Sequence, residues 1–399
     1  VDLREQASRA VVRDDEVAVD GKTLRVPARN VDLKKRMAFC LHCNVALGDG
    51  IKDWYVKEAL QDWNKKLEQY LDGQIDMRSL RKTAKARPTI LVKVNGNREA
   101  LTATREDRAK LWRALRKLKL MRKDPDLLIE PTPYYDTRHT KVPAFGFDKY
   151  YKFYNPRQLL ITIKLIKLIR RAGKKIEREK RRQGWDATSA HKYAEAVTTY
   201  LAMALYKYAL YNCLMTSYDA TNRKAMRHAV SVRGFFMTWN WTDLSPLTLE
   251  FAGSYARNIN SLIYGLSYLV RALARSKSKI TILRDDATTL SKLSDGKFDV
   301  IVTDPPFKDD ISYTEISDFY YVLLKRALSD VVRADRTKTR RPRFMTEAFY
   351  QGDVEIETQW MAFADKEVSE NRGRAKHFGK GVGGPEHFKE LLARSFERM

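Results

Sequence analysis

The sequence predicts an α/β protein: part of a Rossmann-like parallel sheet, a large, basic, mostly helical insertion, and a small N-terminal β module. Three observations lead to this fold class. Residues 279–307 read as strand, acidic turn, short helix and strand, the order typical of a parallel α/β sheet. Long stretches with helical periodicity fill the middle of the chain. Residues 1–100 instead alternate between short β-branched runs and turn residues.

The composition fits a folded protein with a polyanionic partner. Of the 399 residues 44% are hydrophobic, and the formal net charge is +25, far more than solubility requires. DNA is therefore the first expected partner, and RNA stays an alternative. Nucleic acid is favoured over an anionic membrane surface, and no uninterrupted apolar run reaches the ~20 residues that span a bilayer, so no membrane partner is expected. Three cysteines and an N-terminus without an apolar secretory core predict the reducing cytoplasm.

Residues 1–100 form the first predicted segment, a small mixed module. The stretch "DEVAVDGKTLRVPA" alternates around Asp20-Gly21, which predicts a hairpin, and "RPTILVKVNGNRE" is a β-branched run closed by Asn95-Gly96. A helix is expected from about Asp53 to Tyr70.

Cys40 and Cys43 have the spacing of half a zinc ribbon. A tetrahedral zinc site needs four ligands, and the chain holds no second pair; its third cysteine, Cys213, falls in a distant helix. An incomplete zinc site and a metal-free remnant both stay open.

Residues 101–250 form the second predicted segment, a basic helical region. An amphipathic helix is expected over "TREDRAKLWRALRKLKLMRK" from Thr104, and another starts near Pro156. Between 151 and 185 the chain has twelve Lys or Arg against two Glu. We expect this stretch to contact the DNA backbone, with binding that falls steeply as salt rises. The predicted DNA contacts are Arg157, Lys164, Lys167, Arg170, Arg171, Lys174 and Lys175.

Two further features of this region have structural interpretations. "YNPRQ" at 154–158 reads either as a phosphate or cofactor contact or as a helix start capped by Asn155, and the cap is favoured. The stretch 189–215 is apolar around most of a helical circumference, so we expect a central helix packed on several sides.

Residues 251–330 are the predicted α/β catalytic segment. Helices are expected at about 256–274 and 316–328, with strands at about 279–284 and 298–303. Residues 331–399 follow as a charged, Gly-containing loop and a terminal helix.

The second predicted strand stops on Asp304-Pro305-Pro306-Phe307, where open α/β sheets bind their ligands. Asp304 supplies a carboxylate acceptor, and the prolines hold the backbone extended so that carbonyls point outward in a fixed direction. Phe307 supplies a flat face on which a heteroaromatic ring can stack. These groups together suit the exocyclic amino group of a nucleobase.

Such an amino group is a poor nucleophile because its lone pair is delocalised into the ring. Two acceptors that hold its hydrogens would draw the nitrogen towards tetrahedral geometry and stabilise the positive charge that develops as it attacks a methyl group. The base must leave the duplex to reach such a site, and an aromatic platform helps to hold it there. An ordinary Pro-rich turn is the structural alternative.

"DVIVTDPPF" and "ISYTEISDFYYVLLKRAL" resemble the catalytic segment of amino-group DNA methyltransferases, in particular the adenine-specific DNA methylases that carry a zinc-ribbon-like insertion. "YNPRQLL" (154–160), "YAEAVTTYLAMAL" (193–205) and "MTWNWTDLSPL" (237–247) resemble the same proteins in the same order. The resemblance runs from about Met37 to the C-terminus. It implies that Asp304, Pro305 and Phe307 hold the target adenine, and Pro306 completes the predicted catalytic turn.

The resemblance also implies S-adenosylmethionine as cofactor, with Asp286 near its adenosyl part, and a restriction-modification or phage-defence setting. Asp285 stands where the family usually has Gly, and Phe307 where it commonly has Tyr. Cytosine N4 methylation and a non-catalytic DNA-binding subunit are the alternative functions.

The Gly-rich cofactor loop of this fold is not recognisable in the sequence. "EFAGSYARN" (250–258) and "HFGKGVGG" (377–384) are more typical of ordinary loops. Two strands do not make a stable open sheet. The chain also begins with Val1 and ends inside an apparent helix. We therefore expect it to be the middle of a longer or split methyltransferase, with the missing N- and C-terminal parts or other defence-system subunits as partners.

Overall fold

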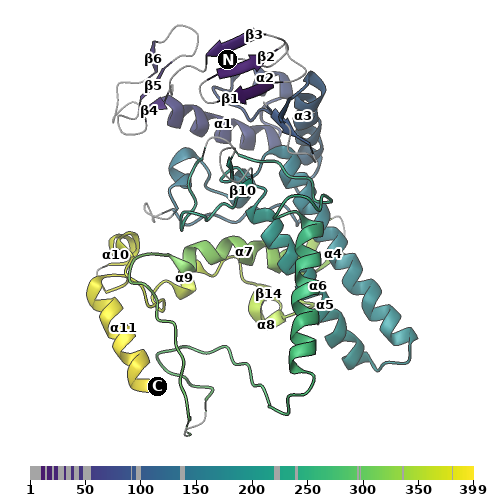
Figure 1. Cartoon of the computed structure of the whole chain (residues 1–399), viewed down its shortest axis with the longest axis vertical. Helices are drawn as coiled ribbons and strands as arrows, with labels where there is room; N and C mark the ends of the chain where they lie inside the picture. The colour runs from purple at the N-terminus through teal and green to yellow at the C-terminus, as the bar shows by residue number, and fades with distance from the viewer. Residues whose placement is uncertain are drawn as a thin grey trace. The chain divides into compact units, whose positions relative to one another are not determined.

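The architecture is that of a computed structural model, drawn in Figure 1. It describes residues 10–13, 16–19, 22–25, 31–32, 37–39, 45–47, 55–90, 92–95, 100–134, 140–219, 225–238, 241–293, 296, 298–334, 337–379 and 381–399. The chain forms two compact units. Unit 1 comprises residues 1–127, 142–164 and 219–224, and unit 2 comprises residues 128–141, 165–218 and 225–399. The predicted boundaries near 100, 250 and 330 stay predictions.

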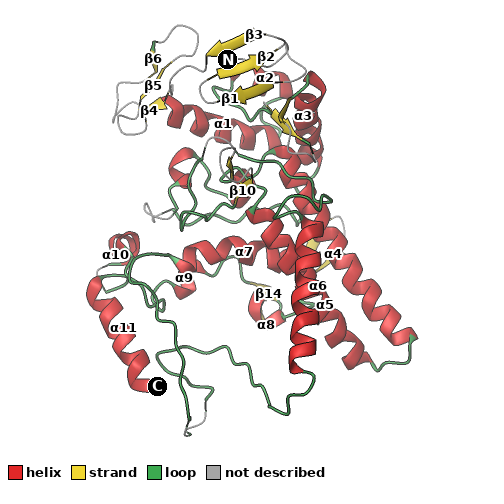
Figure 2. Cartoon of the chain, in the orientation of Figure 1, coloured by secondary structure: helices red, strands yellow, loops and turns green. Residues whose placement is uncertain are grey.

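The described residues are mostly helical (Figure 2). The helices are α1 (Tyr55–Leu71), α2 (Met77–Thr83), α3 (Arg105–Leu120), η1 (Val142–Phe145), η2 (Tyr150–Phe153), α4 (Pro156–Arg182), α5 (Ala187–Leu210), α6 (Tyr255–Leu273), α7 (Tyr313–Leu328), α8 (Thr346–Phe349), α9 (Trp360–Phe363), α10 (Arg372–Phe378) and α11 (Pro385–Arg398). The long helices expected from periodicity are confirmed to within a few residues at their starts. In the part of the chain covered by the structure, no helix is both long and apolar enough to cross a membrane.

The strands are short and their ladders are antiparallel. They are β1 (Ala10–Arg13), β2 (Glu16–Val19), β3 (Lys22–Arg25), β4 (Val31–Asp32), β5 (Met37–Phe39), β6 (Ala46–Leu47), β7 (Val92–Val94), β8 (Ala100–Thr102), β9 (Ser217–Asp219), β10 (Ala225–Arg227), β11 (Asp330–Ala334), β12 (Thr337–Arg341), β13 (Tyr350–Gln351) and β14 (Val354–Glu355). The hairpin predicted around Asp20-Gly21 is confirmed by the β2–β3 ladder, which pairs Glu16 with Arg25 and Val19 with Lys22.

In unit 1, α1 packs against α2, α3 and η1. Helix α3 starts with a reciprocal cap: the Asp107 amide donates to Thr104 Oγ1 at 3.2 Å, and the Thr104 amide donates to Asp107 Oδ2 at 3.0 Å. Its apolar face buries Leu111, Leu115 and Leu118, as its periodicity predicted. The rings of Trp63 and Trp112 meet edge to face at 6.4 Å, which joins α1 to α3.

In unit 2, α5 is the central helix. It packs against both α6 and α7 and buries mostly small side chains, which allow close approach. These buried residues are Ala190, Ala194, Thr198, Ala202, Ala204, Leu205, Tyr208, Ala209 and Leu210. The expectation of a helix packed on several sides is therefore confirmed.

The predicted Rossmann-like parallel sheet is absent from the described residues, and this part of the fold prediction is wrong. Residues 279–284 and 298–303 are irregular chain between α6 and α7 (Figure 2). Their apolar side chains face solvent: Ile282 is 90% exposed and Val302 is 88% exposed. The physical reason is that an extended segment becomes a strand only when a neighbour pairs with its backbone, and no neighbouring strand lies beside these segments in the described structure.

Candidate functional site

The turn Asp304–Phe307 is presented to solvent. Asp304 and Pro305 are exposed, Pro306 is half-buried, and the Phe307 ring is 68% exposed. No hydrogen bond to the Asp304 carboxylate is formed by the residues that the structure describes. Its acceptor oxygens and the face of the Phe307 ring are therefore accessible to an incoming group.

The residues after the turn are held firmly. The Lys308 amide donates to Pro306 O at 3.0 Å, and the Asp310 amide donates to Phe307 O at 2.9 Å. Lys308 adopts a left-handed backbone with φ of 40°, and its carbonyl accepts from the Glu370 amide at 2.9 Å. Its ammonium lies 3.4 Å from Glu370 Oε2. A non-glycine residue in this conformation persists only where surrounding contacts hold it.

A buried ion cluster fixes the start of α7. Glu367 accepts from the amides of Tyr313 and Thr314, at 3.2 and 2.6 Å, and so caps the first turn. The Arg374 guanidinium joins Glu367 to Glu315, with Nη2 at 2.6 Å from Glu367 Oε2 and at 2.5 Å from Glu315 Oε2. Arg374 and Glu315 have no exposed side-chain surface. The cluster therefore sets the position of the chain that leads from Phe307 into α7.

A cleft of about 550 Å³ opens beside this helix start, a size within the range of small-ligand pockets. Aromatic rings, acids and cations all contribute to its wall. Its lining residues include Arg233, Tyr313, Asp318, Tyr320, Tyr321, Phe363, Lys366 and Glu367. Arg233, which pairs with Asp310, has a left-handed φ of 62°. Two non-glycine residues in this strained conformation, Arg233 and Lys308, thus lie close to the cleft and the turn.

Asp285 and Asp286 form a compact turn of their own. Asp286 Oδ1 accepts from the amide and hydroxyl of Thr288, at 2.8 and 2.6 Å. Asp285 accepts from Ser291 Oγ at 3.0 Å and from the Lys292 amide at 2.5 Å. The hydrogen bonds from Thr288 lower the pKa of Asp286, and the nearby positive charge of Lys366, a residue of the cleft wall, adds to this.

The described residues do not fit S-adenosylmethionine as a pocket by themselves. Both acids expected to contact it bond within their own turn, and neither lines the cleft. Gly253 of "EFAGSYARN" follows no strand; with φ of 88°, it lies so close to Tyr211 that an added Cβ would fall 2.2 Å from the ring. The glycines of "HFGKGVGG" that the structure describes follow α10, a helix.

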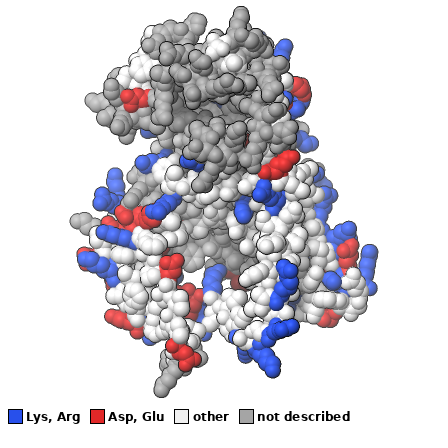
Figure 3. Space-filling model, in the orientation of Figure 1, with Lys and Arg blue, Asp and Glu red and all other residues white. Residues whose placement is uncertain are grey.

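Helix α4 carries an exposed basic stripe. Lys164, Arg171, Lys175, Arg178 and Arg182 are all exposed. At 3.6 residues per turn they fall within an arc of about 60° and extend along roughly 27 Å of helix. Figure 3 shows blue Lys and Arg side chains along the edge where Figure 1 draws α4. We call these five residues the α4 stripe.

The other predicted DNA contacts lie differently. Arg170 is only 8% exposed and donates to the Arg326 carbonyl at 3.2 Å, so it is an interior residue. Lys174 pairs with Asp330, and Lys167 is half-buried. The half-buried Arg157 belongs to the first turn of α4.

The helix-cap interpretation of Asn155 is confirmed. Asn155 Oδ1 accepts from the amides of Arg157 and Gln158, at 2.8 and 3.0 Å. Asn155 is buried, so its side chain serves the helix start.

Cys40 and Cys43 lie outside the described residues. Within the described ranges, no group of three or more His, Cys, Asp or Glu side chains is arranged to hold a metal ion. Cys213 is fully buried, and burial raises the pKa of its thiol to about 12, so it stays neutral at physiological pH.

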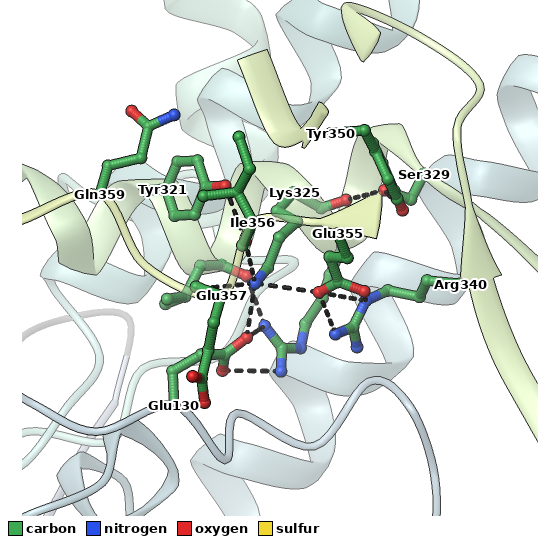
Figure 4. A network of polar contacts seen from close by, with 12 residues as sticks. Glu130, Tyr321, Lys325, Ser329, Arg340, Tyr350, Glu355, Ile356, Glu357 and Gln359 are labelled. Carbon is green, nitrogen blue, oxygen red and sulfur yellow. Dashed lines mark hydrogen bonds and ion pairs between the residues drawn. The ribbon is translucent and has the colours of Figure 1, made fainter. Parts of the chain in front are cut away.

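A buried ionic network on α7 was not predicted from the sequence (Figure 4). Lys325 Nζ lies 2.9 Å from Glu130 Oε1 and 3.0 Å from Glu355 Oε1. The same ammonium also donates hydrogen bonds to the carbonyls of Ile356 and Glu357, at 3.1 and 2.7 Å. Arg326 holds Glu130 through two parallel hydrogen bonds of 2.8 Å each. The ammonium of Lys325 is saturated, so its role is structural.

No spacing rule would have found this network, because Glu130 lies almost two hundred residues before Arg326 in the sequence. The only signal was a pair of adjacent cations in an otherwise apolar stretch, "YYVLLKRAL". Buried cations require acidic partners, although their identity depends on the fold.

Comparison of the chain with protein-family models, with curated proteins and with solved structures finds no match.

Proposed function

We propose that this chain supplies the DNA-contacting and target-base parts of a DNA methyltransferase that acts on the exocyclic N6 amino group of adenine. One observation carries the proposal: the turn Asp304–Phe307 presents a carboxylate and an aromatic face to solvent while the residues directly after it are held in place. A turn that packed inward would leave no room for an extruded base. The resemblance of "DVIVTDPPF" to amino-group methylases supports the same conclusion.

The α4 stripe supports DNA as the substrate. Five exposed cations on one side of a helix can contact successive phosphates, and each neutralised phosphate releases counterions. The amino group of adenine would then be held by the Asp304 carboxylate and a backbone carbonyl of the turn, with its ring stacked on Phe307.

Asp304→Ala in the organism that encodes the chain tests the proposal, because every native partner is then present. The exposed Asp353→Ala is the matched control, since it removes the same charge from another surface. We expect Asp304→Ala to remove N6-methyladenine from a defined set of genomic sites, read by single-molecule sequencing, while Asp353→Ala leaves it unchanged. Loss of N4-methylcytosine instead would identify cytosine as the substrate.

A non-catalytic DNA-binding subunit is the second candidate, favoured by the local hydrogen bonding of Asp285 and Asp286. Deletion of the whole gene separates the two. If deletion removes methylation and Asp304→Ala does not, the chain is a non-catalytic subunit. If neither change alters methylation, both candidates are wrong.

A further inference from the structure

The C-terminal half of α6 is an apolar surface that nothing covers in the described structure. Its N-terminal turn is held by α5, where Asn258 Nδ2 donates to Ala204 O at 3.3 Å. Beyond it, large apolar side chains are exposed around the whole helix, although a helix with that pattern normally lies in an interior. These residues are Ile263, Tyr264, Leu266, Tyr268, Leu269, Val270 and Leu273.

The two segments that follow have unpaired backbones as well as exposed apolar side chains. Residues 279–284 and 298–303 form no backbone hydrogen bonds with the other described residues. Sixteen large apolar side chains are exposed among the described residues between 263 and 307. An apolar, β-branched segment with free N–H and C=O groups is a template for pairing with another strand.

The charge around this surface indicates what covers it. Between residues 263 and 303 the chain has seven Lys or Arg and four Asp, a net charge of +3. Figure 3 shows blue side chains around the free end of α6. A second copy of the chain would bring the same positive charge to the contact, and like charges repel across an interface. A complementary partner is therefore acidic around an apolar centre.

We propose that residues 263–293 and 298–303 form a docking surface for an acidic polypeptide that presents an open β-sheet edge. Residues 279–284 and 298–303 add to this edge as strands, and α6 packs on a face of the extended sheet. Strands buried on both faces explain why both segments are rich in apolar residues. The biological consequence, a cofactor-binding sheet beside Asp304, rests on the proposed function, whereas the docking itself does not.

Site-specific cross-linking in the native organism tests the docking. The photoreactive residue p-benzoylphenylalanine replaces Val300, which is 75% exposed, or Val354, which is 71% exposed and serves as the matched control. We expect Val300→p-benzoylphenylalanine to cross-link to one acidic polypeptide. Capture alone does not establish the contact, so the native complex is then purified for hydrogen exchange.

In that complex we expect the amides of residues 279–284 and 298–303 to exchange more than about tenfold more slowly than in the chain alone, because strand pairing protects them. The double variant Ile282→Lys, Val302→Lys is expected to abolish both the cross-link and the protection. It should keep the helical circular dichroism, since both side chains are exposed.

Cross-linking to a second copy of the chain, equal cross-linking from position 354, no cross-link, or a captured polypeptide without amide protection would each overturn the proposal. Amide protection is measured without reference to methylation. If the amides are protected while Asp304→Ala leaves methylation unchanged, the docking stands and the proposed function falls.

Discussion

Lys325 and Arg326 are adjacent residues of α7 with no exposed side-chain surface, and the carboxylates of Glu130 and Glu355 compensate their charge. Burial alone would raise the pKa of the Glu130 carboxyl, but the positive charges of Arg326 and Lys325 outweigh burial and lower it to about 2. The network ties residue 130 and the β14 hairpin to α7. The network thereby stabilises the C-terminal end of α7, and the N-terminal end of the same helix lies beside the candidate site.

Removing one partner from this network should be costly, because it leaves cations buried without compensation. For Glu130→Gln we expect a loss of about 3–5 kcal/mol in the free energy of unfolding. Glu386→Gln is the control: Glu386 is 86% exposed and pairs with Lys389 at 3.1 Å, and its loss should change stability little. Urea unfolding followed by circular dichroism measures both. Equal stability of the two variants would contradict the structural role of the network.

The lowered pKa of the Glu130 carboxyl predicts how the free energy of unfolding changes in acid. Its folded pKa of about 2 lies below the ordinary value of 4.5, so folding favours the ionised form. Its contribution is fully present above pH 4.5 and is lost as the pH falls from 4.5 towards 2. The difference in unfolding free energy between wild type and Glu130→Gln should therefore narrow over that range. A difference that stays constant from pH 7 to pH 3 would contradict the assignment.

At the scale of elements, α4 has a buried apolar side and an exposed basic side. Its buried side carries Ile163, Ile166 and Ile169 and helps to form the interior. Its exposed side carries the α4 stripe. A DNA contact on such a helix would not reduce the free energy of folding, because the exposed cations stay hydrated when the chain folds. They would lose water only when phosphates bind.

Neutralising the α4 stripe should weaken DNA binding in a salt-dependent way. For Lys164→Gln, Arg171→Gln, Lys175→Gln and Arg178→Gln combined, we expect the slope of log K against log salt to fall by up to about 0.9 for each phosphate that the helix no longer neutralises. The control neutralises four exposed cations on other helices, Lys65, Lys82, Lys389 and Arg398. Fluorescence anisotropy with duplex DNA at several salt concentrations distinguishes them. If both quadruple variants weaken DNA binding equally, net charge alone would explain the effect, and a specific role of the α4 stripe would be contradicted.

The helices could be predicted from sequence because their information is local. Thr104, Asn155 and the apolar period of α3 lie within a few residues of the elements that they define. Whether residues 279–284 and 298–303 form strands could not be predicted from such local information. Their composition favours extended chain, but pairing depends on a neighbour that need not be close in sequence.

The candidate site shows the same limit. The turn Asp304–Phe307 could be recognised from residue type and spacing, whereas the cleft beside it is formed by residues from 230 to 367. Arg170 was placed on the DNA face by its sequence neighbours, although its guanidinium is buried against α7.

At the scale of the whole molecule, each unit has its own core, and the surface between α6 and α7 stands apart as apolar and unpaired. The carboxylates expected to contact a cofactor bond within their own turn. We therefore expect the isolated chain to show no saturable binding of S-adenosylmethionine by isothermal titration calorimetry. Saturable binding at micromolar concentration would contradict the conclusion that these residues do not form the pocket.

Hydrogen exchange of the isolated chain, followed by mass spectrometry, tests the central structural claim most directly. Residues 279–284 and 298–304 should exchange nearly as fast as an unstructured peptide, while the buried helix α5 should exchange slowly. Slow exchange at 279–284 and 298–304, comparable to that of α5, would show that these segments are already paired within the isolated chain. It would contradict the claim that they are unpaired until a partner sheet binds.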